Sequence, residues 1–103
     1  MELDAVFRAL ADETRREILE LLLEDEHVQR ELHEHFDVSQ PTLSQHLAVL
    51  RDAGLVEVRR EGRFAHYRLA ERALEPLVDW TLPFQEFWGR RLQALGDYLR
   101  RNP

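Results

Sequence analysis

The stretch SQPTLSQHLAVLRDAG, from Ser39 to Gly54, decides the fold. Ser39 is a favourable N-cap for a helix, and Pro41 fits the first turn, where its missing N–H would have had no partner. Gly54 is suited to a left-handed C-terminal cap. The buried stripe of this helix is predicted to be Leu43, Leu47 and Leu50. Its first turns carry short hydroxyl and amide side chains where a surface helix ordinarily carries Glu and Lys, which indicates a surface made for hydrogen bonding.

A shorter helix precedes this stretch. Val28, Leu32 and Phe36 recur every four residues, which is typical of one helix face. A tight turn at Asp37-Val38 then joins this helix to the next one. Two short helices connected in this way predict a helix-turn-helix over residues 28–53.

A β-hairpin is predicted directly after the helix-turn-helix, over residues 55–69. The sequence LVEVRREGRFAHYRL indicates two strands around a Glu61-Gly62 turn. The pairs predicted on the inner face are Val58 with Ala65 and Val56 with Tyr67, and those on the outer face are Arg59 with Phe64 and Glu57 with His66. The hairpin would form a wing with an arginine-rich tip.

The rest of the chain is predicted to be helical. A first helix covers Glu2 to Leu10, and Asp12 caps a second helix that begins with ETRREILELLLED. The last segment, from Ala70 to the end, is helical again and bent or broken at Pro83. The fold class is therefore mainly α with a β-hairpin wing (α+β), a winged helix-turn-helix in one domain over residues 1–103.

Apolar and aromatic side chains form a broad stripe after Pro83. On so small a domain this stripe needs a partner surface, which is either the first helix or a second copy of the chain. We expect a homodimer that is built by helices at residues 1–10 and 71–101. The expected interface residues are Leu3, Phe7, Phe84, Phe87, Trp88, Leu92, Leu95 and Leu99.

Composition sets the broad class of protein. Hydrophobic residues make up 44% and charged residues 33% of the 103 residues, which is ordinary for a globular chain. The absence of cysteine excludes disulfides and thiolate metal sites. No apolar run is long enough to span a membrane and the beginning lacks a signal peptide, so we expect a cytoplasmic protein without a membrane partner.

The net charge of −6 is unevenly distributed along the chain. Residues 1–38 hold 4 Arg and 12 acids, a balance of −8, whereas residues 39–69 hold 5 Arg and 3 acids, a balance of +2. Because salt confines surface fields to about 10 Å, the local sign matters more than the total. The basic excess coincides with the helix predicted after Ser39 and with the predicted wing.

This arrangement predicts that double-stranded DNA is the partner. In a winged helix-turn-helix the second helix enters the major groove, where amides and hydroxyls can hydrogen-bond to base edges. The residues expected on the reading surface are Gln40, Thr42, Ser44, Gln45 and His46, although His46 is equally suited to a structural hydrogen bond. The residues expected to contact phosphates are Arg59, Arg60 and Arg63 in the wing and Arg15 and Arg16 in the second helix.

Two blocks of sequence resemble a known family. FRALADETRREILELL and VSQPTLSQHLAVLRDAGLVEVRREGRFAHYRL are similar, in composition and order, to the ArsR (arsenic-repressor-like) winged-helix transcriptional regulators. The tail LVDWTLPFQEFWGRRLQALGDYL further resembles members related to the SdpR-type autorepressors, which lack the family's metal sites. The resemblance implies a homodimeric repressor that binds an inverted-repeat operator. It also implies that the repressor regulates its own promoter. No inducer is indicated by the sequence.

The alternatives to this function are a metal-responsive repressor, a winged helix that binds protein, and an enzyme. The thiolate box of the metal-sensing members would fall at Val28 and Arg30, which are not ligands, and no His follows His66. His27 and Glu31 could form half of a non-thiolate metal site that a dimer mate completes, which keeps a metal-responsive repressor as an alternative. The prediction is nevertheless no metal and no cofactor. A winged helix that binds protein is disfavoured because the recognition helix lacks aromatic anchors, and no catalytic motif indicates an enzyme.

Overall fold

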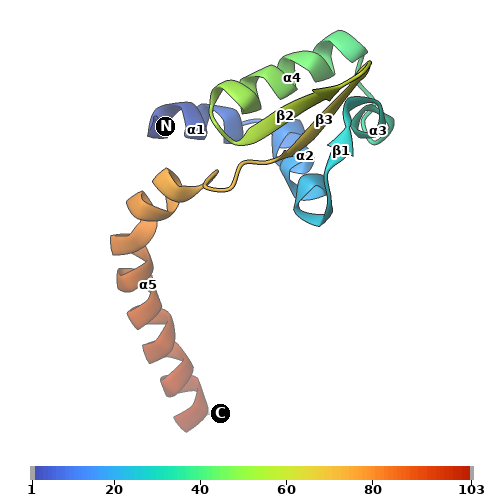
Figure 1. Cartoon of the computed structure of the whole chain (residues 1–103). Coiled ribbons are helices and arrows are strands. Elements are labelled where there is room, and N and C mark those ends of the chain that lie inside the picture. The colour runs from blue at the N-terminus through green and yellow to red at the C-terminus, as the bar shows by residue number, and fades with distance from the viewer. Residues whose placement is uncertain (1, 103) are drawn as a thin grey trace.

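The computed structural model describes residues 2–102. Figure 1 shows a compact unit of helices and strands from which one long helix projects. The elements in chain order are α1 (Leu3–Leu10), α2 (Glu13–Glu24), β1 (His27–Val28), α3 (Gln29–Glu34), α4 (Gln40–Asp52), β2 (Val56–Glu61), β3 (Phe64–Leu69) and α5 (Glu75–Arg101). This order confirms the predicted fold class, which is mainly α with a hairpin wing.

The predicted caps position the helix-turn-helix. The Asp12 carboxylate accepts the N–H of Arg15 at 3.1 Å at the start of α2, and the Ser39 hydroxyl accepts the N–H of Thr42 at 3.2 Å at the start of α4. Gly54 has φ of 81°, and the N–H of Leu55 after it donates to the carbonyl of Leu50. A left-handed glycine followed by this hydrogen bond is the Schellman motif, which ends a helix. Both boundaries of α4 are therefore fixed by local chemistry.

The core lies between the three middle helices and the inner face of the sheet. The leucine stripe of α4 is completely buried against α2 and β2. The fully buried large side chains are Val6, Ile18, Leu32, Leu43, Leu47, Leu50 and Leu55. At about 1.5–3 kcal/mol for each such side chain, this burial holds α4 on the domain and leaves its other face to solvent.

The sheet corrects two predictions. β1 pairs with β3, so the sheet has three strands in the order β1-β3-β2, and Val28 belongs to a strand where a helix was predicted. The predicted hairpin register is wrong, because Val58 pairs with Tyr67 and Arg59 with His66. The turn lies at Gly62-Arg63 instead of Glu61-Gly62, since Gly62 (φ 62°) takes the first turn position, where hairpins favour glycine. The shift is by an even number of residues along the partner strand, so Val56 and Tyr67 still share the buried face.

Helix α5 continues through Pro83 and is not broken there. Its beginning contacts α1, where the rings of Phe7 and Trp80 meet edge to face at 5.5 Å between centroids. Beyond this contact it runs away from the compact unit, and Figure 1 shows it changing direction on the way. None of its residues is buried. Helix α1 therefore covers only the beginning of α5.

Candidate nucleic-acid interface

The exposed face of α4 presents the predicted reading residues. Gln40, Ser44 and Gln45 are exposed, and Thr42 is half-buried. Thr42 accepts the hydroxyl of Ser39 at 2.9 Å, and Ser44 accepts the side-chain amide of Gln29 at 2.8 Å. Within residues 2–102 no hydrogen bond occupies the side-chain amide of Gln40 or Gln45. These two glutamines are consequently the side chains of α4 with the most freedom to pair with a base edge.

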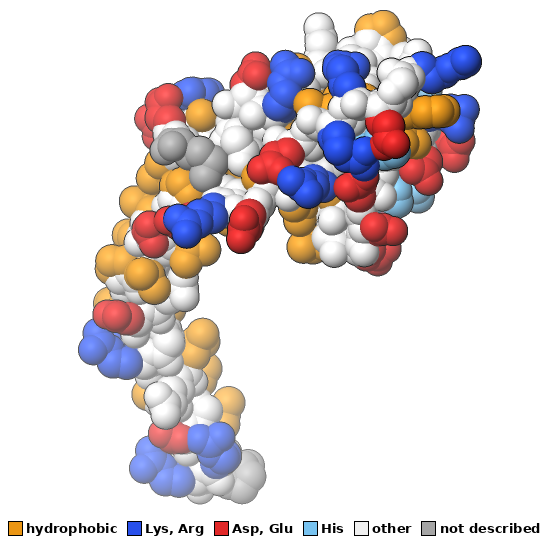
Figure 2. Space-filling model, viewed as in Figure 1, with side chains coloured by type: hydrophobic (Ala, Val, Ile, Leu, Met, Phe, Trp, Pro, Cys, Tyr) orange, Lys and Arg blue, Asp and Glu red, His pale blue; other side chains and the backbone are white. Residues whose placement is uncertain are grey.

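A hollow separates the start of α4 from the wing. It has a volume of about 390 Å³, and Arg60 and Arg63 line it together with Gln40 and Ser44. Arg30, at the start of α3, also lines it and lies 5.7 Å from the ring centroid of Phe64. Figure 2 shows several basic side chains over the part of the molecule that contains α4 and the hairpin. We refer to this site as the basic hollow.

Arg30 was missed at the sequence level. It is not among the predicted phosphate contacts, although it stands at the beginning of the first helix of the helix-turn-helix. In this motif the first helix crosses the DNA backbone, so an arginine at its start was a signal for a phosphate contact. The hollow thus gathers three arginines from two segments that lie about 30 residues apart in the sequence.

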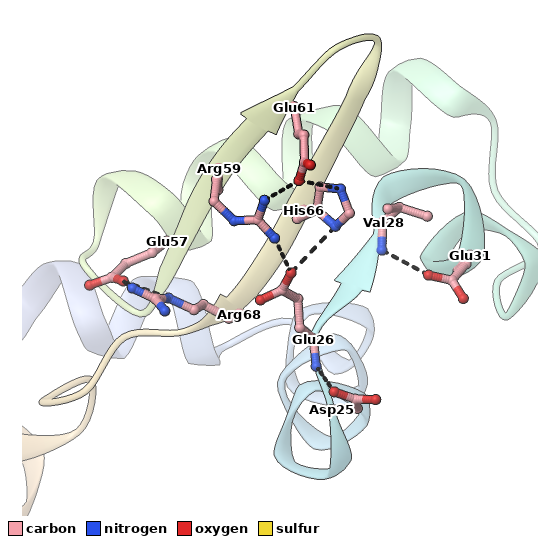
Figure 3. A network of polar contacts seen from close by, with 9 residues as sticks. All are labelled: Asp25, Glu26, Val28, Glu31, Glu57, Arg59, Glu61, His66 and Arg68. Atoms are coloured by element: carbon pink, nitrogen blue, oxygen red, sulfur yellow. Dashed lines mark hydrogen bonds and ion pairs between the residues drawn. The ribbon is translucent and has the colours of Figure 1, made fainter.

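Arg59 lies on the other face of the hairpin, because successive strand residues alternate between faces. Its guanidinium donates to Glu26 at 2.6 Å and to Glu61, and His66 lies 3.3 Å from Glu26 (Figure 3). The hydrogen bonds to Glu61 and then to Glu26 raise the pKa of Arg59. This predicted phosphate contact is therefore already occupied by two carboxylates. On the same outer face, Arg68 of β3 forms an ion pair with Glu57 of β2 at 2.9 Å.

Arg15 and Arg16 also have partners within the chain. Arg15 donates to the carbonyls of Ala9 at 2.7 Å and Arg8 at 2.9 Å, and Arg16 donates to the carbonyl of Leu10 at 2.6 Å. They satisfy the free carbonyls at the end of α1, which every helix leaves unpaired. Both residues were predicted to contact phosphates, and the structure gives them this structural task.

His46 connects α4 to the same corner of the molecule. Its Nδ1 atom lies 3.3 Å from Nη1 of Arg15 and 3.8 Å from the carboxylate of Asp12. Burial raises the pKa of Asp12, but the N–H of Arg15 and the charge of His46 outweigh it, and the net pKa is lowered. Of the two roles predicted for His46, the structure displays the hydrogen-bonded one.

The predicted dimer residues lie on α1 and α5. Leu3 is half-buried and Phe7 is 39% exposed, while Trp88, Leu92 and Leu95 are all more than half exposed. The exposed fractions of the other three, Phe84, Phe87 and Leu99, lie between 39% and 55%. Figure 2 shows hydrophobic side chains along the projecting helix. The stripe is present, and within the described residues only its beginning is packed.

The three histidines of residues 24–35, EDEHVQRELHEH, do not group around one point with the acids beside them. His27 lies 4.0 Å from Glu31 and ring to ring with His35 at 6.4 Å, while His33 bonds to the carbonyl of Val38 at 2.8 Å. Among residues 2–102, no three His, Asp or Glu side chains are grouped to hold a metal ion. No helix in this range combines the length and apolarity needed to cross a membrane.

Comparison with known proteins agrees with this geometry. Residues 12–58 match the family model for "Bacterial regulatory protein, arsR family". The chain is 38% identical over 79 residues to the transcriptional repressor SdpR of Bacillus subtilis, covering 77% of this chain and 88% of that protein. It is 40% identical over 77 residues to an arsenical resistance operon repressor of Staphylococcus aureus, covering 75% and 74%.

A solved structure covers nearly the whole chain. The ArsR-like transcriptional regulator from Rhodococcus sp. RHA1 superposes with a TM-score of 0.74 at 33% identity, over 98% of this chain and 93% of that one. This family and these relatives are transcriptional regulators and not enzymes. The chain belongs to the arsR family of bacterial regulatory proteins and is a DNA-binding transcriptional regulator.

Proposed function

We propose that this regulator represses transcription as a homodimer bound to an inverted repeat. The observation that carries the proposal is α5, a helix of 27 residues of which none is buried. Ten of its large hydrophobic side chains are exposed, which is a far larger apolar surface than a monomer of this size ordinarily leaves in water. A second copy that covers this surface would hold two recognition helices around a two-fold axis.

Two helices related in this way match a DNA site with the same symmetry. Half-sites would lie about 34–36 Å apart, one helical turn, so that both α4 helices enter the major groove on one side of the duplex. In this proposal Gln40 and Gln45 hydrogen-bond to base edges, while Arg30, Arg60 and Arg63 hold the backbone in the basic hollow. The whole chain acts as one domain, with residues 1–10 and 71–101 for dimerisation, 28–53 for recognition and 55–69 as the wing.

Repression is the outcome that the relatives favour. SdpR and the arsenical resistance regulator are named as repressors, although another relative, HlyU of Vibrio cholerae, is named as an activator. A dimer bound across a promoter blocks polymerase without contacting it. Repression therefore requires no surface on the protein for binding polymerase. We extend the proposal to the regulator's own promoter and to the cytoplasm, where the DNA lies.

Selection of genomic fragments by the purified protein tests this proposal. We expect the bound fragments to share an inverted repeat that includes a promoter, and sedimentation to give twice the mass of one chain. Transcription from the selected promoter should fall when the protein is added in vitro. Fragments without a shared symmetric motif would overturn the specific operator, and a monomer at binding concentrations would overturn the dimer.

A further inference from the structure

An apolar hollow lies on the body of the molecule beside the start of α5. It has a volume of about 270 Å³ and is lined by leucines from α1, α2, β3 and the segment that leads into α5. Among them Leu23 is 73% exposed and Leu74 is 43% exposed. We call this site the leucine hollow. Leucine side chains so exposed on a small domain call for a covering surface.

The chain's own α5 does not cover this hollow. α5 begins beside Leu74 and extends about 40 Å at 1.5 Å per residue, and Figure 1 shows it leading away from the body. The radius of gyration is 17.9 Å, compared with about 13 Å for a compact chain of this length. Within residues 2–102, the exposed apolar side chains in the far half of α5 therefore have no surface to pack on, and the leucine hollow has no helix over it.

Two-fold symmetry can bring the two together. In an isologous dimer a contact from one residue to another is repeated in reverse, so two antiparallel helices pair residues whose numbers add to a constant. If the α5 helices cross near Phe87, Leu99 of one copy stands level with Leu74 of the other. The far end of each helix is then level with the partner's leucine hollow.

Charge continues this match beyond the hollow. Glu20 lines the leucine hollow and also an adjoining acidic hollow that contains Glu17 and Glu24. The end of α5 has the corresponding order, because exposed Leu99 is followed by Arg100, which pairs with Asp97, and by Arg101. An apolar side chain followed by an arginine would meet an apolar hollow followed by three carboxylates.

Two glycines in the exposed part of α5 point to a close neighbour. Glycine inside a helix costs about 1 kcal/mol relative to alanine. A Cβ atom at Gly89 would meet nothing within 4 Å, and at Gly96 it would meet only the Arg100 guanidinium at 4.0 Å. No described residue of the chain excludes a side chain at either position. A helix of a second copy that crosses closely gives both glycines a reason.

We propose that the last two turns of α5 cover the leucine hollow of the second copy, with Arg101 beside the partner's Glu20 and Glu24. This inference rests on the proposed homodimer and adds to it the surface on the body that receives the helix end. Each hollow is completed by the other copy. The contact would also tie the far end of α5 to α2, which precedes the helix-turn-helix.

Cross-linking tests the contact directly, because the natural chain has no cysteine. In the variant Leu23→Cys with Leu99→Cys, a short bis-maleimide should join two chains and give a covalent dimer on denaturing gels. Each single variant is one control. The matched control is Val49→Cys with Leu99→Cys, since Val49 is also exposed but lies on α4. Sedimentation of every variant establishes whether it is a dimer before cross-linking.

The outcomes separate the two proposals. More covalent dimer than in the two single variants and in Val49→Cys with Leu99→Cys supports the inference. No excess over Val49→Cys with Leu99→Cys, in variants that sediment as dimers, overturns the inference and leaves the homodimer intact. A wild-type protein that sediments as a monomer overturns both.

Charge reversal provides a second measurement without cysteines, for the case in which those variants fail to fold or to dimerise. Glu20→Arg or Arg101→Glu should each raise the dimer dissociation constant by about 2- to 30-fold, since two symmetric ion pairs are lost. The double variant Glu20→Arg with Arg101→Glu should recover most of this loss. Single variants without effect, or a double variant weaker than both, would overturn the contact.

Discussion

Removing the two wing arginines from the basic hollow should weaken DNA binding without regard to sequence. In the variant Arg60→Ala with Arg63→Ala, a dimer loses four guanidiniums that we place against phosphates. Each phosphate contact contributes about 0.9 to the slope of log affinity against log salt, so the slope should become shallower by up to about 3.6. The ratio of the affinity at about 50 mM salt to the affinity at about 200 mM salt would then be about 100-fold smaller for the variant than for the wild type. Operator and unrelated DNA should lose affinity alike, because phosphates carry no sequence.

The matched control removes the same charge from the same hairpin. In Arg59→Ala with Arg68→Ala, the lost guanidiniums are those already paired with carboxylates on the outer face. The slope should then change by less than about one unit. All four arginines are exposed, so Arg60→Ala with Arg63→Ala should alter stability by no more than about 0.5 kcal/mol. Arg59→Ala with Arg68→Ala also loses exposed ion pairs to Glu26, Glu61 and Glu57 and should be the less stable of the two variants.

Fluorescence anisotropy titrations at several salt concentrations, on operator and unrelated duplexes, measure both slopes. An unchanged slope in Arg60→Ala with Arg63→Ala would refute the assignment of the hollow to the DNA backbone. Equal changes in both double variants would show that overall charge, and not placement, determines binding. Arg30→Ala, from a different helix, should lower the slope by up to about 1.8 per dimer.

The other predictions concern specificity, assembly and pH. Gln40→Ala or Gln45→Ala should cost about 1–3 kcal/mol on the operator and little on unrelated DNA, as competition titrations would reveal. Trp88→Asp with Leu95→Asp should give a folded monomer that binds DNA weakly, and a dimer in analytical ultracentrifugation would contradict it. Asp12→Asn keeps a capping side chain but removes the carboxylate, and the pKa of the Asp12 carboxyl is lowered in the folded state. The wild type should therefore be more stable than Asp12→Asn above about pH 4, and the difference in stability should disappear as pH falls through the lowered pKa. Urea unfolding midpoints that differ equally at about pH 3 and about pH 7 would refute this.

Local patterns in the sequence predicted the elements that local chemistry determines. Helix α4 begins at a serine cap and ends at Gly54, and its leucines repeat at the spacing of one buried face, so neither its bounds nor its orientation depends on distant residues. The predicted register of the hairpin failed for a different reason. Glu61-Gly62 and Gly62-Arg63 both place Gly62 in a two-residue turn, and the choice between them depends on which turn position the glycine takes.

The function of each arginine could not be predicted from the sequence, because it depends on tertiary contacts. Arg59 and Arg60 are neighbours in the chain, yet one of the two carboxylates that hold Arg59 belongs to Glu26, 33 positions away. Arg15 has the basic character of a phosphate ligand, but the carbonyls at the end of α1 take it up once the corner between α1 and α2 has formed. A strand of two residues, such as β1, likewise has no periodicity and exists only because β3 is there to pair with it.

The division of the arginines explains how a chain of net charge −6 can bind a polyanion. The guanidinium of Arg59 is paired with two carboxylates, and that of Arg15 donates to backbone carbonyls of α1, so the donors of both are directed within the chain. Arg30, Arg60 and Arg63 face one hollow beside the recognition helix and concentrate their charge there. Screening limits the reach of the acidic residues elsewhere to about 10 Å, so a phosphate in the hollow interacts mainly with these three cations. Two such hollows in a dimer would position the backbone on both sides of the operator and leave the choice of sequence to the amides of α4.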